Sequence, residues 1–187
     1  MKKYRSIFFL ATFLMLIFIS FSFAKTEALN LEQVKEEVEK EWIPRLVGRV
    51  TDLAKVFPEA RLMELTKKLT QYENETTHQI VILTIPSLRG EAIESFSLRV
   101  ANAWGIGHHG LDNGILITVA TGDRQIRIEV GFGLEKAVPD QLAARIISED
   151  MIPAFRKGDY ASGIEIAADS LMKAARQYVV PPDKMPK

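Results

Sequence analysis

Residues 115–130, ILITVATGDRQIRIEV, decide the fold because they hold two strand-forming runs joined by a turn. Ile115 to Ala120 is rich in β-branched residues, and Gln125 to Val130 alternates apolar with polar side chains. The link Thr121-Gly122-Asp123-Arg124 has the composition of a hairpin turn, so we expect the two strands to pair antiparallel. The strict alternation in the second strand indicates one face in contact with water, which places this strand nearer an edge of the sheet.

A further strand is predicted at His78 to Ile85, HQIVILTI. Its apolar residues are continuous instead of alternating, which is typical of a strand buried on both faces and therefore of a sheet covered by helices on both sides. The sequence thus predicts an α/β fold, a three-layer α/β/α sandwich. It would have a mixed sheet of about four strands with a central antiparallel hairpin, and helices on both faces. The chain is expected to enter this domain at Val50 to Val56.

Four helices are expected from the spacing of apolar residues and from the residues that begin and end each run. They cover Pro58 to Asn74, Glu91 to Trp104, Asp140 to Ile152, and Asp159 to Tyr178. In the third of these helices, Asp140 has the side chain of an N-cap residue, and the proline that follows, Pro153, is expected to stop the helix.

The length and composition suit one globular domain. The chain has 187 residues, of which 47% are hydrophobic and 26% charged, and one core accounts for a chain of this size. We place the domain at residues 49–179, after a leader helix or linker at 25–48 and before a tail at 180–187. That tail is too short and too polar to be a membrane anchor.

The first 24 residues have the pattern of a signal peptide. Two lysines and an arginine precede an apolar run from Ile7 to Phe23, and Ser22-Phe23-Ala24 offers the small residues of a cleavage site. The alternative is an uncleaved membrane anchor, since the run is about as long as the shortest membrane-spanning helices. In both cases the positive charges before the run predict an exported, periplasmic or otherwise extracytoplasmic domain. Contact with the membrane is expected only through an uncleaved N-terminal segment.

The charge balance and the lack of cysteine exclude several classes of function. Without residues 1–24 the chain has 24 acidic residues against 21 Lys and Arg, a net charge of −3, so nucleic acid is not an expected partner. No cysteine is present, which excludes disulfides, thiol catalysis and thiolate metal sites. A metal ion would have to be bound by oxygen atoms or imidazole.

Acidic residues gather in the loops around the predicted hairpin. Asp112-Asn113 leads into its first strand and Glu135 follows its second strand, so the hairpin should bring them together. Asp140 begins the next helix, and Asp52 lies before the first helix. Carboxylate and amide oxygens are the ligands that Ca²⁺ binds in proteins. The same residues are also common in turns and at helix N-caps, where no ion is needed.

Several separated motifs, in their order and spacing, resemble those of the TPM domain family. They lie in AWGIGHHGLDNGILITVATGDRQIRIEVGFGLEKAVPD (103–140) and MIPAFRKGDYASGI (151–164), with Val-x-Asp at Val50 to Asp52 upstream. The resemblance covers about Val50 to Tyr178. The sequence departs from the family's pattern at Lys136, where similar members often have glycine, and it shows no C-terminal transmembrane helix or glycine-rich tail.

The resemblance implies a mixed sheet between helices and divalent-cation binding by acidic residues. The ion would be Ca²⁺ or Mg²⁺, and the candidate ligands are Asp52, Asp112, Asn113, Glu135 and Asp140. One plant thylakoid member of the family is an acid phosphatase linked to photosystem repair. Two hypotheses follow. In the first, the chain is an exported, cation-binding accessory domain of the cell envelope that binds a protein partner and has no settled catalysis. In the second, it is a metal-dependent acid phosphatase of phosphate monoesters, with Arg124 or Arg127 binding the anion.

Overall fold

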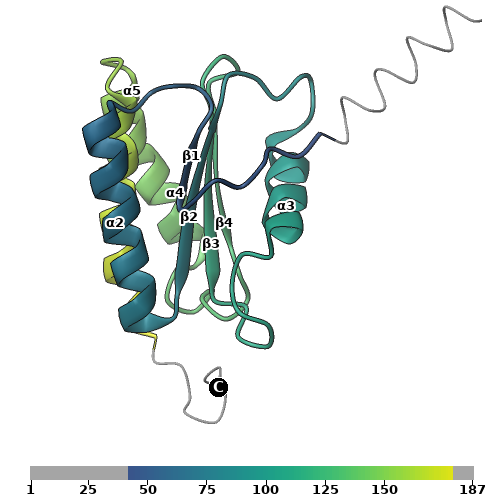
Figure 1. Ribbon diagram of the computed structural model, residues 1–187, viewed down its shortest axis with the longest axis vertical. Coiled ribbons are helices and arrows are strands. Elements are labelled where there is room, and N and C mark those ends of the chain that lie inside the picture. The colour runs from purple at the N-terminus through teal and green to yellow at the C-terminus, as the bar shows by residue number, and fades with distance from the viewer. Residues whose placement is uncertain (1–41, 179–187) are drawn as a thin grey trace, which may run out of the picture. The chain divides into compact units, whose positions relative to one another are not determined.

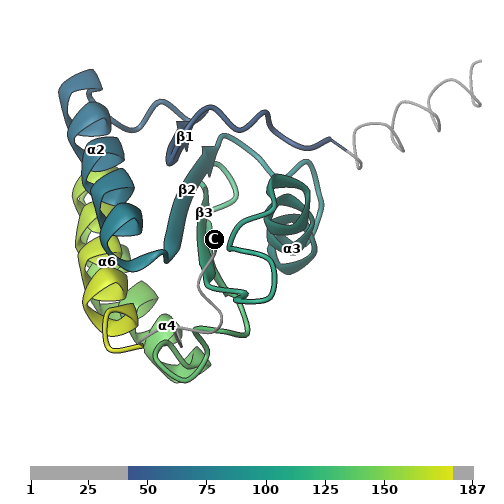
Figure 2. The ribbon, with the colours of Figure 1, turned by 60° about the horizontal axis from the view of Figure 1, so that its bottom comes forward.

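The computed structural model describes residues 42–178, and in them a four-stranded sheet lies between two layers of helices (Figures 1 and 2). The spatial order of the strands is β1 (Val50–Asp52), β2 (Gln79–Ile85), β3 (Gly114–Ala120) and β4 (Gln125–Val130). The first three are parallel, and β3 pairs antiparallel with β4. The predicted mixed sheet and its hairpin are confirmed. The hairpin supplies one central strand, β3, and one edge strand, β4.

Helices cover both faces of the sheet, as predicted, but unequally. In the described part of the chain, α3 (Ile93–Trp104) is the only helix on one face (Figure 2). The other face carries α2 (Glu59–Thr76), α4 (Asp140–Ile146) and α6 (Tyr160–Ala175). The main hydrophobic core lies under these three helices.

The continuous apolar run of β2 explains why both layers form. Ile80 and Ile82 belong to the main core. Val81 and Leu83 alternate with them, so they point to the α3 side of the sheet, and they are equally buried. A strand with this pattern cannot leave either face in water.

The third predicted helix differs from the structure at both ends. Pro139 occupies the N-cap position, and Asp140 is the first helical residue and makes no side-chain capping bond, so the assignment of Asp140 as N-cap was wrong. The prediction that Pro153 stops the helix was also wrong. The helix continues through a π-helical segment, η1 (Ile147–Met151), into α5 (Ile152–Phe155). The wider π-helical turn changes the pattern of backbone hydrogen bonds just before Pro153, which has no N–H to donate.

The remaining boundaries agree within a few residues. Asp159, the predicted start of the last helix, is the N-cap residue of α6, and its carboxylate accepts a hydrogen bond from Ser162 N at 3.1 Å. Such a bond satisfies one of the free N–H groups in the first turn of a helix. The helix ends at Ala175, three residues earlier than predicted.

The signal segment, most of the leader segment and the tail lie outside the described residues. Residues 42–47 have no regular secondary structure. The indole Nε1 of Trp104 donates a hydrogen bond to the carbonyl oxygen of Pro44 at 2.8 Å, which fixes this entering segment to the end of α3. Among the helices of residues 42–178, none is long and apolar enough to span a membrane.

Candidate functional site

The loop before β3 and the loop after β4 pack backbone against backbone. Gly131 N donates to Gly114 O at 2.8 Å, and Gly133 N donates to Asp112 O at 3.0 Å. A Cβ on Gly131 would lie 2.2 Å from the carbonyl oxygen of Asp112, so this position requires glycine. The two acidic loops are therefore neighbours, as the hairpin pattern predicts.

An open groove of about 410 Å³ lies beside these loops, between α3 and β4. We call it the acidic groove, because its carboxylates come from four places in the chain: Asp112, Glu129, Glu135 and Asp140. All but Glu129 are exposed. Within residues 42–178, no three Asp, Glu or His side chains lie close enough together to hold a metal ion as they stand. An ion in this groove would have to draw the carboxylates inward.

Arg127 is the one basic side chain among the described residues that line the acidic groove. Its Nε donates to Glu129 Oε2 at 2.8 Å. This hydrogen bond raises the pKa of Arg127, and the negative charges of Glu129, Glu94 and Asp140 raise it further, against a smaller opposing effect of burial. The guanidinium is therefore a permanent positive charge among the acids, and it would compete with a bound cation.

The rim of the acidic groove is apolar in two places. Leu98 on α3 is 51% exposed, and Phe132 in the loop after β4 is 80% exposed. Among the described residues that line the groove, they are the two large hydrophobic side chains that are exposed.

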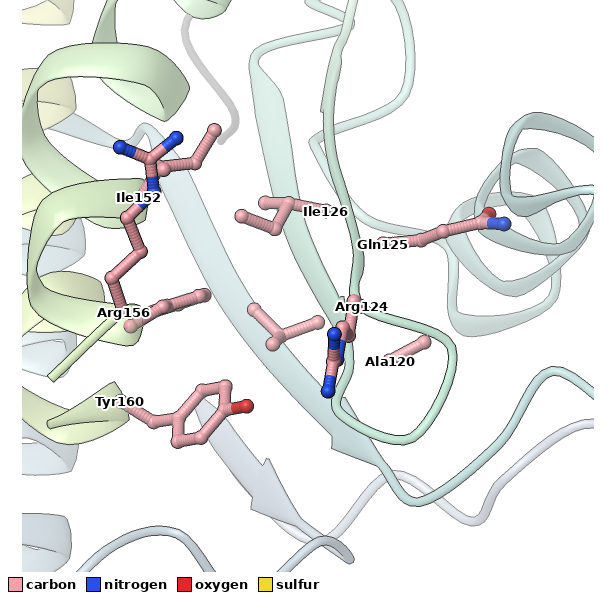
Figure 3. Close-up of a pocket in the computed structure, with 9 residues that line it drawn as sticks. Ala120, Arg124, Gln125, Ile126, Ile152, Arg156 and Tyr160 are labelled. Carbon is pink, nitrogen blue, oxygen red and sulfur yellow. The ribbon is translucent and has the colours of Figure 1, made fainter. Parts of the chain in front are cut away.

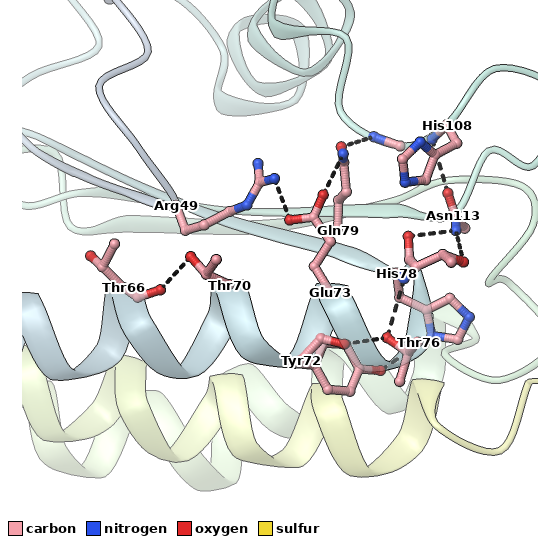
Figure 4. A network of polar contacts seen from close by, with 12 residues as sticks. Arg49, Thr66, Thr70, Tyr72, Glu73, Thr76, His78, Gln79, His108 and Asn113 are labelled. Carbon is pink, nitrogen blue, oxygen red and sulfur yellow. Dashed lines mark hydrogen bonds and ion pairs between the residues drawn. The ribbon is translucent and has the colours of Figure 1, made fainter. Parts of the chain in front are cut away.

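Asn113 turns away from the acidic groove and is completely buried (Figure 4). Its Oδ1 accepts a hydrogen bond from His108 N at 2.9 Å, and its Nδ2 donates to Thr77 O at 2.8 Å. The amide thereby connects the glycine-rich loop to the end of α2. The structure does not bring Asn113 together with the candidate ligands beside it in sequence.

A second set of bonds supports the same loop (Figure 4). Arg49 pairs with Glu73 on α2, and Glu73 accepts a hydrogen bond from Gln79 Nε2 at 2.8 Å. Gln79 Oε1 in turn accepts from Gly107 N at 2.7 Å. The loop that carries Asp112 is thus fixed in place by side chains of α2 and β2.

Asp52 lies at the opposite end of the sheet from Asp112. It is the last residue of β1, and because β1, β2 and β3 are parallel, it faces the carboxyl ends of the strands, whereas Asp112 precedes β3. Its carboxylate accepts hydrogen bonds from Val56 N at 3.1 Å, from Phe57 N at 2.9 Å and from the Thr84 hydroxyl. These bonds hold the turn that leads into α2. Asp52 does not share a site with the other four candidates.

The family model of the TPM domain matches residues 50–174. The chain belongs to the TPM domain family. No curated protein matches the sequence.

Three solved structures resemble this TPM domain. The N-terminal domain of a protein from P. gingivalis is 32% identical; the alignment covers 67% of this chain and 80% of that one, with a TM-score of 0.63. The BA42 protein of Bizionia argentinensis is 17% identical, with coverage of 70% and 90% and a TM-score of 0.58. The N-terminal domain of the cg2496 protein of Corynebacterium glutamicum is 16% identical, with coverage of 73% and 88% and a TM-score of 0.55. The last two show the fold alone.

Sequence reasoning missed a second pocket of this TPM domain, at the far end of the hairpin. It measures about 490 Å³, and Arg124, Arg156 and Tyr160 line it (Figure 3). The motifs that contain these residues are visible in the sequence. Some 30 residues separate them, however, and only the folded chain brings them together. Sequence reasoning also missed Glu129 in the acidic groove. The alternation of apolar and polar residues shows on which face of β4 Glu129 lies, but not what lies next to that face.

Proposed function

We propose that this chain is an exported, divalent-cation-binding accessory domain of the cell envelope. In this proposal Ca²⁺ or Mg²⁺ binds in the acidic groove and orders the loops that contact a protein partner. One observation carries it: three carboxylates that the sequence singled out, Asp112, Glu135 and Asp140, line a single groove although they come from different loops. Asn113 and Asp52 are engaged elsewhere and are not part of the proposed site.

The charges of the acidic groove set the expected affinity. Its carboxylates repel one another, and a divalent cation would relieve that repulsion. The ligands are exposed, are few and stand beside the positive charge of Arg127. A dissociation constant on the order of 10⁻⁴ to 10⁻³ M follows, the range of extracellular calcium modules.

The apolar rim suggests where a partner binds. Leu98 and Phe132 both line the groove and are exposed, so a partner that covered them would bury apolar surface, which favours association. An ion that draws Asp112 and Glu135 together would fix the loop of Phe132 between them. Cation binding and partner binding would therefore reinforce each other.

The proposal is tested by thermal unfolding of the chain from Lys25 onward, with Ca²⁺ or Mg²⁺ titrated against chelator. Corresponding N-terminal domains of two relatives are folded in isolation in solution. A ligand that binds only the folded state must raise the melting temperature, by a few degrees at saturation. Asp112→Asn should abolish the rise, because it removes the charge from a backbone position with φ of 47° that asparagine tolerates.

Two further variants sharpen the same titration. Arg127→Gln should strengthen cation binding several-fold, since it removes the competing charge. Glu64→Gln, an exposed change on α2 outside the groove, should leave binding unchanged. If wild type and Asp112→Asn show the same response to millimolar cation, the proposed site is wrong.

The alternative function is a metal-dependent acid phosphatase acting on phosphate monoesters. The position of Arg127 favours it, because a guanidinium in the acidic groove could bind a phosphoryl oxygen next to an ion. Arg124 lies at the other end of the hairpin and takes no part. Release of p-nitrophenol from its phosphate ester, with added Mg²⁺ or Ca²⁺, separates the two functions. The alternative requires a rate that disappears in Asp112→Asn, whereas the accessory domain predicts no turnover in wild type.

A further inference from the structure

The pocket at the far end of the hairpin has apolar walls and a cationic mouth (Figure 3). Ile126 of β4 points into it, and Ile152 of α5 lies across from Ile126. Phe155 of α5 also lines the pocket. Arg124, in the turn between β3 and β4, and the hydroxyl of Tyr160, on α6, point toward one another across the opening. Gln125 points away from it.

The arginines of this pocket differ from most other arginines in residues 42–178. Within residues 42–178, neither Arg124 nor Arg156 forms an ion pair or a side-chain hydrogen bond. Most other described arginines are paired with a carboxylate. They are Arg49, Arg61, Arg99, Arg127, Arg145 and Arg176. Two unpaired guanidinium groups thus lie at one pocket.

The neighbouring acids form no ion pair with these arginines. Asp123 precedes Arg124, but its carboxylate accepts a hydrogen bond from Leu88 N at 2.8 Å. Asp159 precedes Tyr160, but it caps α6 and lies 3.7 Å from Arg61 on α2. No Asp or Glu is among the described residues that line the pocket. The opening is therefore positively charged.

The backbone at Arg124 is left-handed, as it is at four other described non-glycine residues. Its φ is 55°, a left-handed conformation that glycine and asparagine adopt at lower cost than arginine does. Strain of this kind gathers at functional positions. The pocket lies at Val119 and Ala120, the end of β3. The carboxyl ends of parallel strands are where α/β sheets bind their ligands.

We propose that this pocket binds a small organic anion, a phosphate or carboxylate that carries an apolar group. The anionic head is held by Arg124 and the Tyr160 hydroxyl, with Arg156 adding positive charge at the rim. The apolar group packs against Ile126, Ile152 and Phe155. None of the acidic-groove residues lines this pocket, so the site is independent of the proposed cation binding. The anion could be free in solution or be the head of a lipid, and both sources share this chemistry.

The test uses naphthalene-1-phosphonate, which has an anionic head, a flat apolar body and no hydrolysable ester. The chain from Lys25 onward is titrated in the presence of chelator, and binding is followed by calorimetry and by amide shifts in NMR spectra. We expect saturable binding with shifts at Gln125, Ile126 and Tyr160. Inorganic phosphate has only the anionic head and 1-naphthol has only the apolar body. Each should bind at least tenfold more weakly than the phosphonate.

Three variants locate the site. Arg124→Gln should lower the affinity about tenfold, since a charge-assisted hydrogen bond is lost without a change in the strained backbone position. Arg156→Gln should have a smaller effect of the same sign. Arg145→Gln, at an exposed position of α4, is the matched control and should change nothing.

Vesicles of phosphatidylcholine with and without phosphatidylglycerol distinguish the two sources. Binding to the anionic vesicles that is lost in Arg124→Gln/Arg156→Gln identifies a lipid head, whereas binding of the phosphonate alone identifies a free anion. The proposal is overturned if the phosphonate shows no saturable binding at millimolar concentration. It is also overturned if the shifts lie elsewhere, or if the double variant binds the phosphonate as wild type does.

Discussion

At the scale of single residues, Asp52 is an acidic loop residue that stabilises a turn, a role that cannot be told from ion binding in the sequence alone. Its carboxylate accepts three hydrogen bonds, two of them from backbone N–H groups. A carboxylate used in this way stabilises a turn whether or not an ion is present.

Asp52→Asn should therefore destabilise the fold by about 1 to 3 kcal/mol, because one acceptor becomes an N–H group that faces a donor. Urea unfolding in chelator measures this loss. Added Ca²⁺ should leave the difference between wild type and variant unchanged. A difference that appears only with the ion would return Asp52 to the list of ligands.

His78 is a buried residue whose protonation opposes folding. It is 1% exposed, its Nδ1 lies 3.2 Å from the Tyr72 hydroxyl, and its Nε2 has no partner in the described part of the chain. Burial, and to a lesser extent the charge of Arg176, lower the pKa of His78 below its usual 6.5. The unfolded chain binds this proton more readily than the folded one.

The free energy of unfolding should therefore reach its full value above about pH 6.5. It should fall as the pH drops from there toward the lowered pKa of His78. The slope is at most about 1.4 kcal/mol per pH unit. In His78→Asn, which keeps an acceptor near Tyr72, this slope should disappear even though the variant is less stable overall. Denaturant unfolding between pH 5 and 7.5 measures it, with His109→Asn, an exposed change, as control. An unchanged slope in His78→Asn would contradict the assignment.

At the scale of elements, the contact between the two glycine-rich loops determines the shape of the acidic groove. The loops meet through backbone atoms, and a methyl group at Gly131 would occupy the space of the Asp112 carbonyl oxygen. Nothing in the local pattern of apolar residues reports such a contact. The hairpin pattern placed the loop after β4 beside Asp112, but it did not show that the two loops meet through their backbones, which is what makes glycine necessary at position 131.

Gly131→Ala should push the loops apart and cost about 1 to 3 kcal/mol, the usual cost of forcing a methyl group into a filled space. Cation binding should weaken at the same time, because Asp112 and Glu135 separate. Chemical unfolding and a calcium titration measure the two effects. Gly48→Ala is the matched control, since a Cβ there would meet nothing within 4 Å. If both variants behave alike, the loops do not depend on this contact.

At the scale of the whole molecule, the sequence predicts the layers, the hairpin and the edge position of β4, because each follows from a periodic pattern. Asp52 was grouped with Asp112 as a candidate ligand without regard to its place in the sheet, although the helices α2 and α3 between the strands imply parallel connections and hence opposite ends for these two residues. The burial of Asn113 depends on Thr77, which is 36 residues away, and no local signal reports it. The cationic pocket was missed for the same reason.

The hydrogen bond from Trp104 to Pro44 has a mechanical consequence. The strand that follows Pro44, β1, has only three residues and lies at an edge of the sheet. A pull along the entering segment is shared at Pro44: the Trp104 indole passes part of it to α3, and the rest runs along the chain into that short strand. Because α3 is also one wall of the acidic groove, such a pull acts on the candidate site as well as on the sheet.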